Sequence, residues 1–140
     1  LRFLVSTRAP EAWLASLYWQ NLKVTRLGLP REDFIARLAP VADTGPLLAS
    51  IETALGPHPL IRAPLEDSRA HPLGPAWPIL RALDLPDNVT AAMVPHRRLK
   101  ATPDAETVAA VLELNRSALD DADCADAKAM LIALAEGDGA

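Results

Sequence analysis

The sequence predicts an all-α fold, a small helical domain of about five to six helices that occupies residues 1–140. Apolar side chains recur three and four residues apart through most of residues 1–56 and 103–140, which is the spacing of a helix face. Proline and glycine separate these stretches, where they act as helix starts and stops. Residues 57–102 contain many prolines and are expected to form an irregular connecting segment.

The first expected helix runs from Pro10 to Leu27. The fixed φ of proline suits a first helical turn, and Gly28 can adopt the left-handed conformation that ends a helix. The apolar residues form two neighbouring stripes, which predicts a central helix packed on two sides. The stripes are Trp13, Leu17, Val24 and Leu27, and beside them Leu14, Tyr18 and Leu22. Trp19 lies outside both stripes, so it either covers another element or is exposed to a partner.

Two shorter helices are expected next. One runs from Pro30 to Leu38 and is ended by Pro40, which has no backbone N–H to continue the helix. The other begins after Thr44, a residue type favoured at the N-cap, and ends at Gly56.

Strand signals are weak throughout the chain. Phe3–Val5 and Asn88–Val94 could each form a short strand, since both are rich in apolar or β-branched residues. Pro95 and the flanking loops weaken that interpretation, so the sequence predicts no sheet.

The middle segment carries a large aromatic residue between prolines. Trp77 lies between Pro75 and Pro78, which reduce the entropy that this stretch loses on ordering. Two interpretations follow. Trp77 is either a rigid anchor for a partner or a core residue on a short helix over Pro75–Leu83.

Residues 103–140 are expected to form an antiparallel helical hairpin, because their connection is short. Thr102-Pro103 opens the first helix, and Asp120 caps the second, which Gly137 closes. The expected buried face of the first helix contains Val108, Val111, Leu112 and Leu119, with Asn115 in the middle. The expected buried face of the second helix contains Cys124, Ala127, Leu131, Leu134 and Ala135. The central position of Cys124 favours a buried structural thiol over a nucleophile.

Composition narrows the classes of function. The net charge of −4 gives no general attraction to nucleic acid or anionic lipid, and no apolar run is long enough to cross a membrane. A lone cysteine cannot form an internal disulfide, which indicates a reducing, cytoplasmic location. The phosphate-binding glycine loops and the CxxC, HExxH and GxSxG motifs are absent, so no cofactor, metal or catalytic residue is predicted.

The leading interpretation is a non-catalytic helical interaction module, such as an accessory factor, assembly factor or subunit, that binds another protein or itself. The apolar excess of the first helix and the proline-stiffened middle favour it. Its expected anchors are Tyr18, Trp19 and Trp77, because buried aromatic side chains dominate interface energetics. Alanine at either tryptophan is then expected to weaken a complex with little loss of thermal stability.

A first alternative is a small-molecule-binding domain or small enzyme with a pocket under residues 57–83. Arg62 and Arg69 would clamp an anion there, and His71 would serve as a general base.

A second alternative uses the basic cluster of residues 96–100. Arg97, Arg98 and Lys100 could bind an anion or a nucleic-acid backbone. No aromatic residue is interleaved with the cluster to stack on bases, and the whole chain is acidic, so nucleic acid is disfavoured as a partner.

Overall fold

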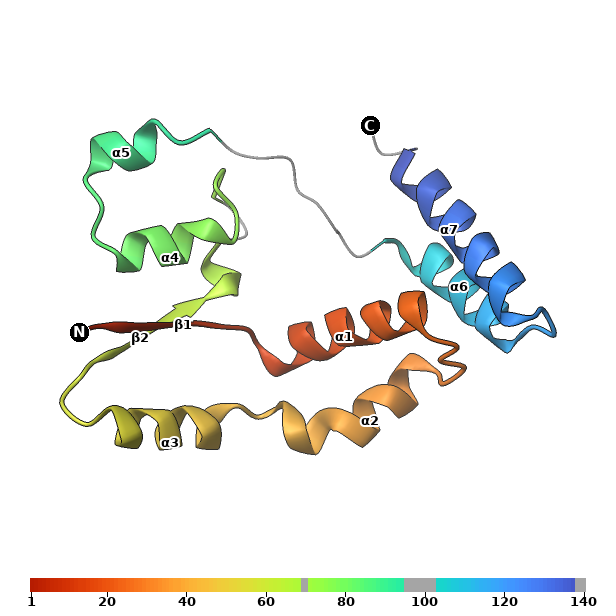
Figure 1. Cartoon of the computed structure of the whole chain (residues 1–140), viewed down its shortest axis with the longest axis horizontal. Helices are drawn as coiled ribbons and strands as arrows, with labels where there is room; N and C mark the ends of the chain where they lie inside the picture. The colour runs from red at the N-terminus through yellow and green to blue at the C-terminus, as the bar shows by residue number, and fades with distance from the viewer. Residues whose placement is uncertain (69–70, 95–102, 138–140) are drawn as a thin grey trace. The chain divides into compact units, whose positions relative to one another are not determined.

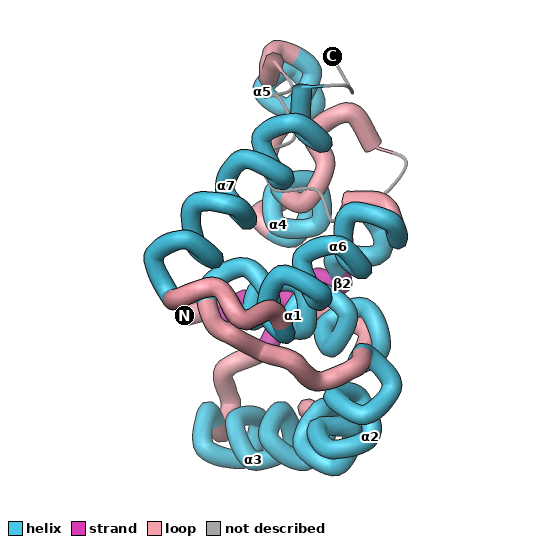
Figure 2. Tube along the Cα trace, turned by 90° about the vertical axis from the view of Figure 1, so that its right-hand side faces the viewer, coloured by secondary structure: helices cyan, strands magenta, loops and turns pink. Residues whose placement is uncertain are grey.

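The structure is a computed structural model that describes residues 1–68, 71–94 and 103–137. Over these residues the chain is mostly helical, with one small sheet, which confirms the all-α prediction (Figures 1 and 2). The chain forms two compact units. Unit 1 comprises Leu1–Ala12 and Asp43–Leu99, and unit 2 comprises Trp13–Ala42 and Lys100–Ala140.

Unit 1 contains a parallel pair of strands, β1 (Phe3–Thr7) and β2 (Leu60–Pro64). In Figure 1 they lie side by side. Phe3 pairs with Leu60, and the N–H of Phe3 donates to the carbonyl oxygen of Pro59 at 3.0 Å. The weak strand signal at Phe3–Val5 is therefore real, and the prediction of no sheet is wrong. β2 has no alternating pattern of its own and forms because a distant strand pairs with it.

The rest of unit 1 is helical and more regular than predicted for the proline-rich middle segment. Its elements are α3 (Gly45–Leu55), the short 3-10 turn η1 (Leu65–Ser68), α4 (Ala76–Ala82) and α5 (Asp87–Ala91). The short helix expected around Trp77 is confirmed as α4. The alternative strand at Asn88–Val94 is wrong, since the N–H groups of Val89 and Thr90 bond back to the carbonyl of Pro86 and start a helix.

Helix α3 has the predicted ends but a different capping contact. Thr44 occupies the N-cap position without a side-chain bond to the helix. Instead, the carboxylate of Asp43 accepts the N–H of Gly45 at 2.8 Å. Gly56 ends the helix at φ +58°, a conformation that costs glycine no steric penalty.

Unit 2 is built from α2 (Arg31–Ala42), α6 (Ala105–Arg116), α7 (Asp121–Gly137) and most of α1 (Pro10–Val24). Helices α6 and α7 form the predicted antiparallel hairpin, drawn in cyan and blue in Figure 1. Helix α2 continues past Pro40, contrary to prediction. One missing hydrogen bond in its last turn is tolerated there, where Ala42 is buried.

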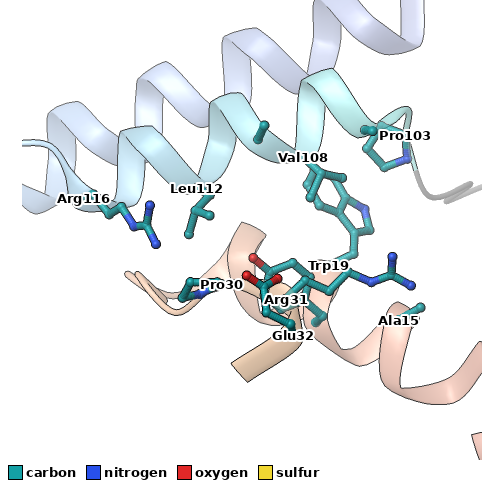
Figure 3. A pocket seen from close by; sticks show the side chains of 12 residues that line it. Ala15, Trp19, Pro30, Arg31, Glu32, Pro103, Val108, Leu112 and Arg116 are labelled. Atoms are coloured by element: carbon teal, nitrogen blue, oxygen red, sulfur yellow. The ribbon is translucent and has the colours of Figure 1, made fainter. Parts of the chain in front are cut away.

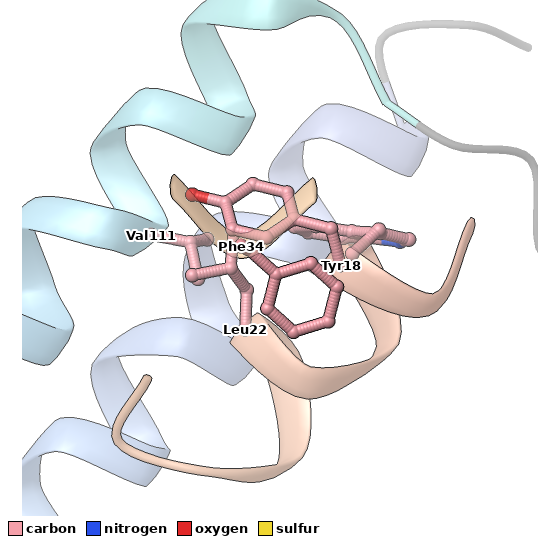
Figure 4. Close-up of a cluster of buried hydrophobic side chains, with 5 residues drawn as sticks. Tyr18, Leu22, Phe34 and Val111 are labelled. Atoms are coloured by element: carbon pink, nitrogen blue, oxygen red, sulfur yellow. The ribbon is translucent and has the colours of Figure 1, made fainter. Parts of the chain in front are cut away.

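The core of unit 2 consists of the buried side chains Tyr18, Trp19, Leu22, Phe34 and Val111. Figure 4 shows Tyr18, Leu22, Phe34 and Val111 close together, and they come from α1, α2 and α6. The rings of Tyr18 and Phe34 are tilted, with their centroids 5.3 Å apart. Aromatic rings that are tilted at this distance stabilise the core by more than the burial of their apolar area alone.

The expected buried faces of α6 and α7 are largely confirmed, with Cys124 fully buried. Leu119 and Leu134 are exceptions, since they are 41% and 66% exposed.

Helix α1 ends at Val24, and Gly28 does not take the predicted left-handed cap conformation. The carbonyl groups at this end are bonded by side chains from the α6–α7 hairpin instead. The amide of Asn115 donates to the carbonyl oxygens of Leu22 and Leu27, both at 3.1 Å. The ammonium of Lys128 donates to Leu22 and Thr25, at 3.3 and 2.9 Å. A tertiary contact thus replaces the glycine cap.

Asn115 and Lys128 also bond to each other in the interior. The Lys128 ammonium donates to Oδ1 of Asn115 at 3.0 Å. Lys128 is buried, with only 5% of its surface exposed. Among the described residues its hydrogen-bond acceptors are three neutral oxygens: the carbonyls of Leu22 and Thr25 at the negative end of α1, and Oδ1 of Asn115 on α6. A buried cation needs such acceptors, so this network fixes how the hairpin docks on α1.

Two aspartates cap the hairpin helices. Oδ1 of Asp120 accepts the N–H of Asp123 at 2.8 Å, which confirms the predicted cap of α7. Helix α6 is capped by Asp104, whose Oδ1 accepts the N–H of Thr107 at 2.7 Å. The predicted start at Thr102-Pro103 is too early, because the helix begins at Ala105 and Pro103 is not helical; Thr102 itself lies outside the described residues. The backbone hydrogen bond from Thr107 lowers the pKa of Asp104 below its ordinary value.

Asp104→Ala is expected to destabilise the protein at neutral pH, by an amount that shrinks in acid. Because the folded-state pKa lies below the unfolded value of about 3.9, the stabilisation is complete above the unfolded pKa. It is lost as the pH falls through the lower, folded-state pKa and the cap is protonated. Urea unfolding of both proteins between neutral pH and about pH 3 measures the difference. A difference that does not change with pH would show that the carboxylate charge has no role.

Candidate functional site

An open groove on unit 2 is the larger of the hollows described below, with a volume of about 600 Å³ (Figure 3). Its walls come from two helices and from the residues that begin α2. Helix α6 contributes Ala105, Val108, Ala109, Leu112 and Arg116, and Pro103 precedes them. Helix α1 contributes Ala15, Tyr18 and Trp19, and the start of α2 contributes Pro30, Arg31 and Glu32. Most of these side chains are apolar, so the groove favours an apolar occupant.

The α6 wall is one continuous helix face. Ala105, Val108, Ala109 and Leu112 follow the spacing that places residues on one side of a helix, and Arg116 extends the same line by one turn. At 1.5 Å per residue the line from Ala105 to Arg116 is about 16 Å long. The groove is therefore a channel about three helical turns in length.

The α1 wall is held rigidly by its own packing. Trp19 is 6% exposed, and the ammonium of Lys23 lies 5.4 Å from the centre of its ring. The hydroxyl of Tyr18 donates to the carbonyl oxygen of Leu29 at 3.1 Å, and burial raises the pKa of Tyr18 above its ordinary value. Each wall also has a small lining residue, Ala15 on α1 and Ala109 on α6. Small side chains on both walls allow another backbone to approach closely.

Three charged side chains border the groove, and they differ in how they are engaged. Arg116 donates to the carbonyl oxygen of Gly28 at 3.0 Å and pairs with Glu113 at 2.9 Å. Glu32 lies in the first turn of α2, where the helix dipole favours negative charge. Arg31 makes no ion pair with any residue in the described ranges. Its guanidinium is the charge available to an incoming group.

The structure changes how the expected anchors Tyr18 and Trp19 are interpreted. Both are core residues of unit 2 that also line the groove. Of the two roles expected for Trp19, the structure shows the one in which it covers another element. Removing either ring would destabilise the core, so a substitution at Tyr18 or Trp19 cannot by itself test for a partner.

The third expected anchor, Trp77, is half-buried in unit 1. Its ring stacks on the imidazole of His71, with centroids 3.9 Å apart and planes 6° apart. Nδ1 of His71 accepts the N–H of Leu73 at 3.2 Å.

The first alternative is represented by a smaller hollow in unit 1, of about 320 Å³. Among the residues that line it are Arg62, Asp67, Trp77 and Arg81. Arg62 is held by an ion pair with Glu52 at 2.8 Å. Arg62 and Trp77 thus both line this hollow and His71 stacks on Trp77, while Arg69 lies outside the described residues.

The basic residues of the second alternative, Arg97, Arg98 and Lys100, also lie outside the described residues. Across the parts of the chain that the structure does describe, no group of three or more His, Cys, Asp or Glu side chains could hold a metal ion. Within those parts, none of the helices combines the length and the apolar character that crossing a bilayer requires.

Sequence reasoning missed the groove residues outside α1. The spacing of α6 identified Val108 and Leu112, but both were expected to face the hairpin core alone. Ala109 and Arg31 carry no signal in a single sequence, because a groove arises only when three helices are placed together. Lys128 did have a signal in the sequence. It is a charged residue within the apolar face between Cys124 and Leu131, just as Asn115 is a polar residue within the apolar face of the preceding helix.

A scan against protein-family models and searches of curated proteins and of solved structures found no match to this chain.

Proposed function

We propose that this protein is an interaction module whose unit 2 groove binds an amphipathic helix of another protein. The single observation that supports this most is the continuous α6 face opposite Tyr18 and Trp19, which together make an apolar channel about three turns long. Helix-in-groove recognition uses such a channel for apolar anchors spaced three and four residues apart.

The shape of the groove favours a helix over other occupants. The walls are largely apolar, so an extended strand would find few backbone partners there. Alanines on both walls, Ala15 on α1 with Ala105 and Ala109 on α6, leave room for a helix backbone. The aromatic wall is fixed before binding by the Tyr18 and Lys23 contacts, which reduces the entropy lost on docking.

Charge adds a second requirement on the partner. Arg31 has no ion-pair partner among the described residues, so a carboxylate on the docked helix would pair with it. The expected partner helix has an apolar face of about three turns and an acidic residue at its border.

Ala109→Gln is expected to weaken this complex at least about tenfold, because a longer polar side chain would fill the groove from its α6 wall. Ala109 is exposed, so its replacement leaves the core unchanged. Native mass spectrometry of the protein purified gently from its host compares the fraction carrying a second polypeptide in the wild type and in the variant.

Ala125→Gln is the matched control, since Ala125 is an exposed alanine on α7 that does not line the groove. The complex should persist in that variant. Equal loss in both variants, or none in Ala109→Gln, would contradict the proposal.

A further inference from the structure

We propose that the outer edge of β1 in unit 1 accepts a further β-strand, supplied by an extended apolar segment of another polypeptide. This second surface is separate from the groove in unit 2 and uses backbone hydrogen bonds.

The first observation is the unpaired edge. In the part of the chain that the structure describes, the sheet has two strands, so β1 has β2 on one side and no strand on the other. Phe3 bonds to Pro59, and in a parallel ladder the bonding residues alternate, so the backbone groups of Phe3, Val5 and Thr7 face β2. The N–H and C=O groups of Leu4 and Ser6 therefore face outward.

The second observation is the composition of β1. Phe3, Leu4 and Val5 form a continuous apolar run instead of an alternating one. Such runs are typical of parallel strands covered on both faces inside a larger sheet. All three residues are only partly buried, although successive side chains point to opposite faces. A pair of strands is also a small sheet on its own, and an added strand would cover more of this apolar surface.

The third observation is that the two edges of the sheet differ. The outward-facing residues of β2 include Arg62 and Pro64. Arg62 is charged and exposed, and Pro64 has no N–H to donate, which are two known ways of blocking an edge strand. The β1 edge has neither feature at Leu4 or Ser6. The asymmetry indicates that β1 is the edge left open to a partner.

The outward-facing backbone groups of Leu4 and Ser6 and the apolar side chains of β1 determine which segment can bind at this edge. It is an extended segment of about five residues, matching Phe3–Thr7, with apolar side chains on both faces and no proline. Its alternate N–H and C=O groups bond to Leu4 and Ser6. Affinity then comes from the backbone, and preference among sequences comes from β-branched side chains beside Phe3 and Val5.

The test is a selection of random eight-residue peptides, displayed on phage, against the whole chain. We expect enrichment of apolar, β-branched, proline-free peptides. Synthetic versions should bind Ser6→Pro at least tenfold more weakly than the wild type, because Ser6→Pro removes an outward N–H while sparing the bonds to β2. Ser6→Ala retains the N–H and should bind as the wild type does. Ala109→Gln, in the groove of unit 2, should also leave binding unchanged.

A second probe does not depend on the folding of Ser6→Pro. N-methylation at alternate peptide residues removes the N–H groups on one edge only, so one N-methyl series should lose binding and the other retain it. Three results would overturn the proposal: no enriched extended family, equal loss in both N-methyl series, or equal binding by folded Ser6→Pro. A concentration-dependent dimer of the wild type, absent in Ser6→Pro, would assign the edge to a second copy and overturn it too.

Discussion

Leu22→Ala is expected to lower the free energy of unfolding by about 2–5 kcal/mol, because Leu22 on α1 is fully buried in the core that α1 forms with α2 and α6. The deleted methyl groups leave a cavity in the core cluster that also contains Tyr18 and Phe34. Val24→Ala, two residues further along the same helix, is the control. Val24 is 66% exposed, so its replacement should cost no more than about 0.5 kcal/mol.

Urea unfolding monitored by circular dichroism measures both variants. Similar losses for Leu22→Ala and Val24→Ala would contradict the core described for unit 2.

Asn115→Ala is expected to lower the free energy of unfolding by about 3 kcal/mol or more. The substitution removes both amide donations, to the carbonyl oxygens of Leu22 and Leu27, and one of the three acceptors of the buried Lys128 ammonium. Buried polar groups that lose their partners are more costly than the net value of the bonds that held them. Asn88→Ala is the control, since Asn88 is exposed on α5 and should tolerate alanine with little change.

A double-mutant cycle with Lys128→Met separates the network from simple packing. Because Asn115 and Lys128 are hydrogen-bonded at 3.0 Å, their effects should be non-additive by about 0.5–3 kcal/mol. Additive effects would show that the two side chains act independently.

Local sequence signals predicted the helical elements well. Pro10 starts α1, Gly56 ends α3 and Asp120 caps α7, and each depends on backbone chemistry within a few residues. Features set by distant partners were missed. β2 is a strand because β1 pairs with it, and α1 ends without a glycine cap because Asn115 and Lys128 bond its carbonyl groups.

In the candidate site, too, local sequence signals identified some residues, while features that depend on distant parts of the chain were missed. Tyr18 and Trp19 were identified as important from their aromatic character, but their burial depends on α2 and α6, which pack on them from elsewhere in the chain. Ala109 and Arg31 matter only through the position they take beside those rings. A single helix pattern predicts which face is apolar, and it does not predict where two apolar faces leave a groove.

The most direct test of the proposed helix-binding function is photo-crosslinking from the groove in the native host. A diazirine-bearing lysine analogue at position 31 keeps a long cationic side chain where Arg31 borders the groove. The same analogue at position 37 is the control, because Arg37 is exposed on α2 and does not line the groove. Tandem mass spectrometry of the cross-linked peptides identifies the segment that is bound.

We expect cross-links from position 31, and not from position 37, to one segment of another protein. That segment should carry apolar residues at helical spacing with an acidic residue beside them. Identical products from both positions, cross-links to a second copy of this chain, or a bound segment without helical spacing would contradict it.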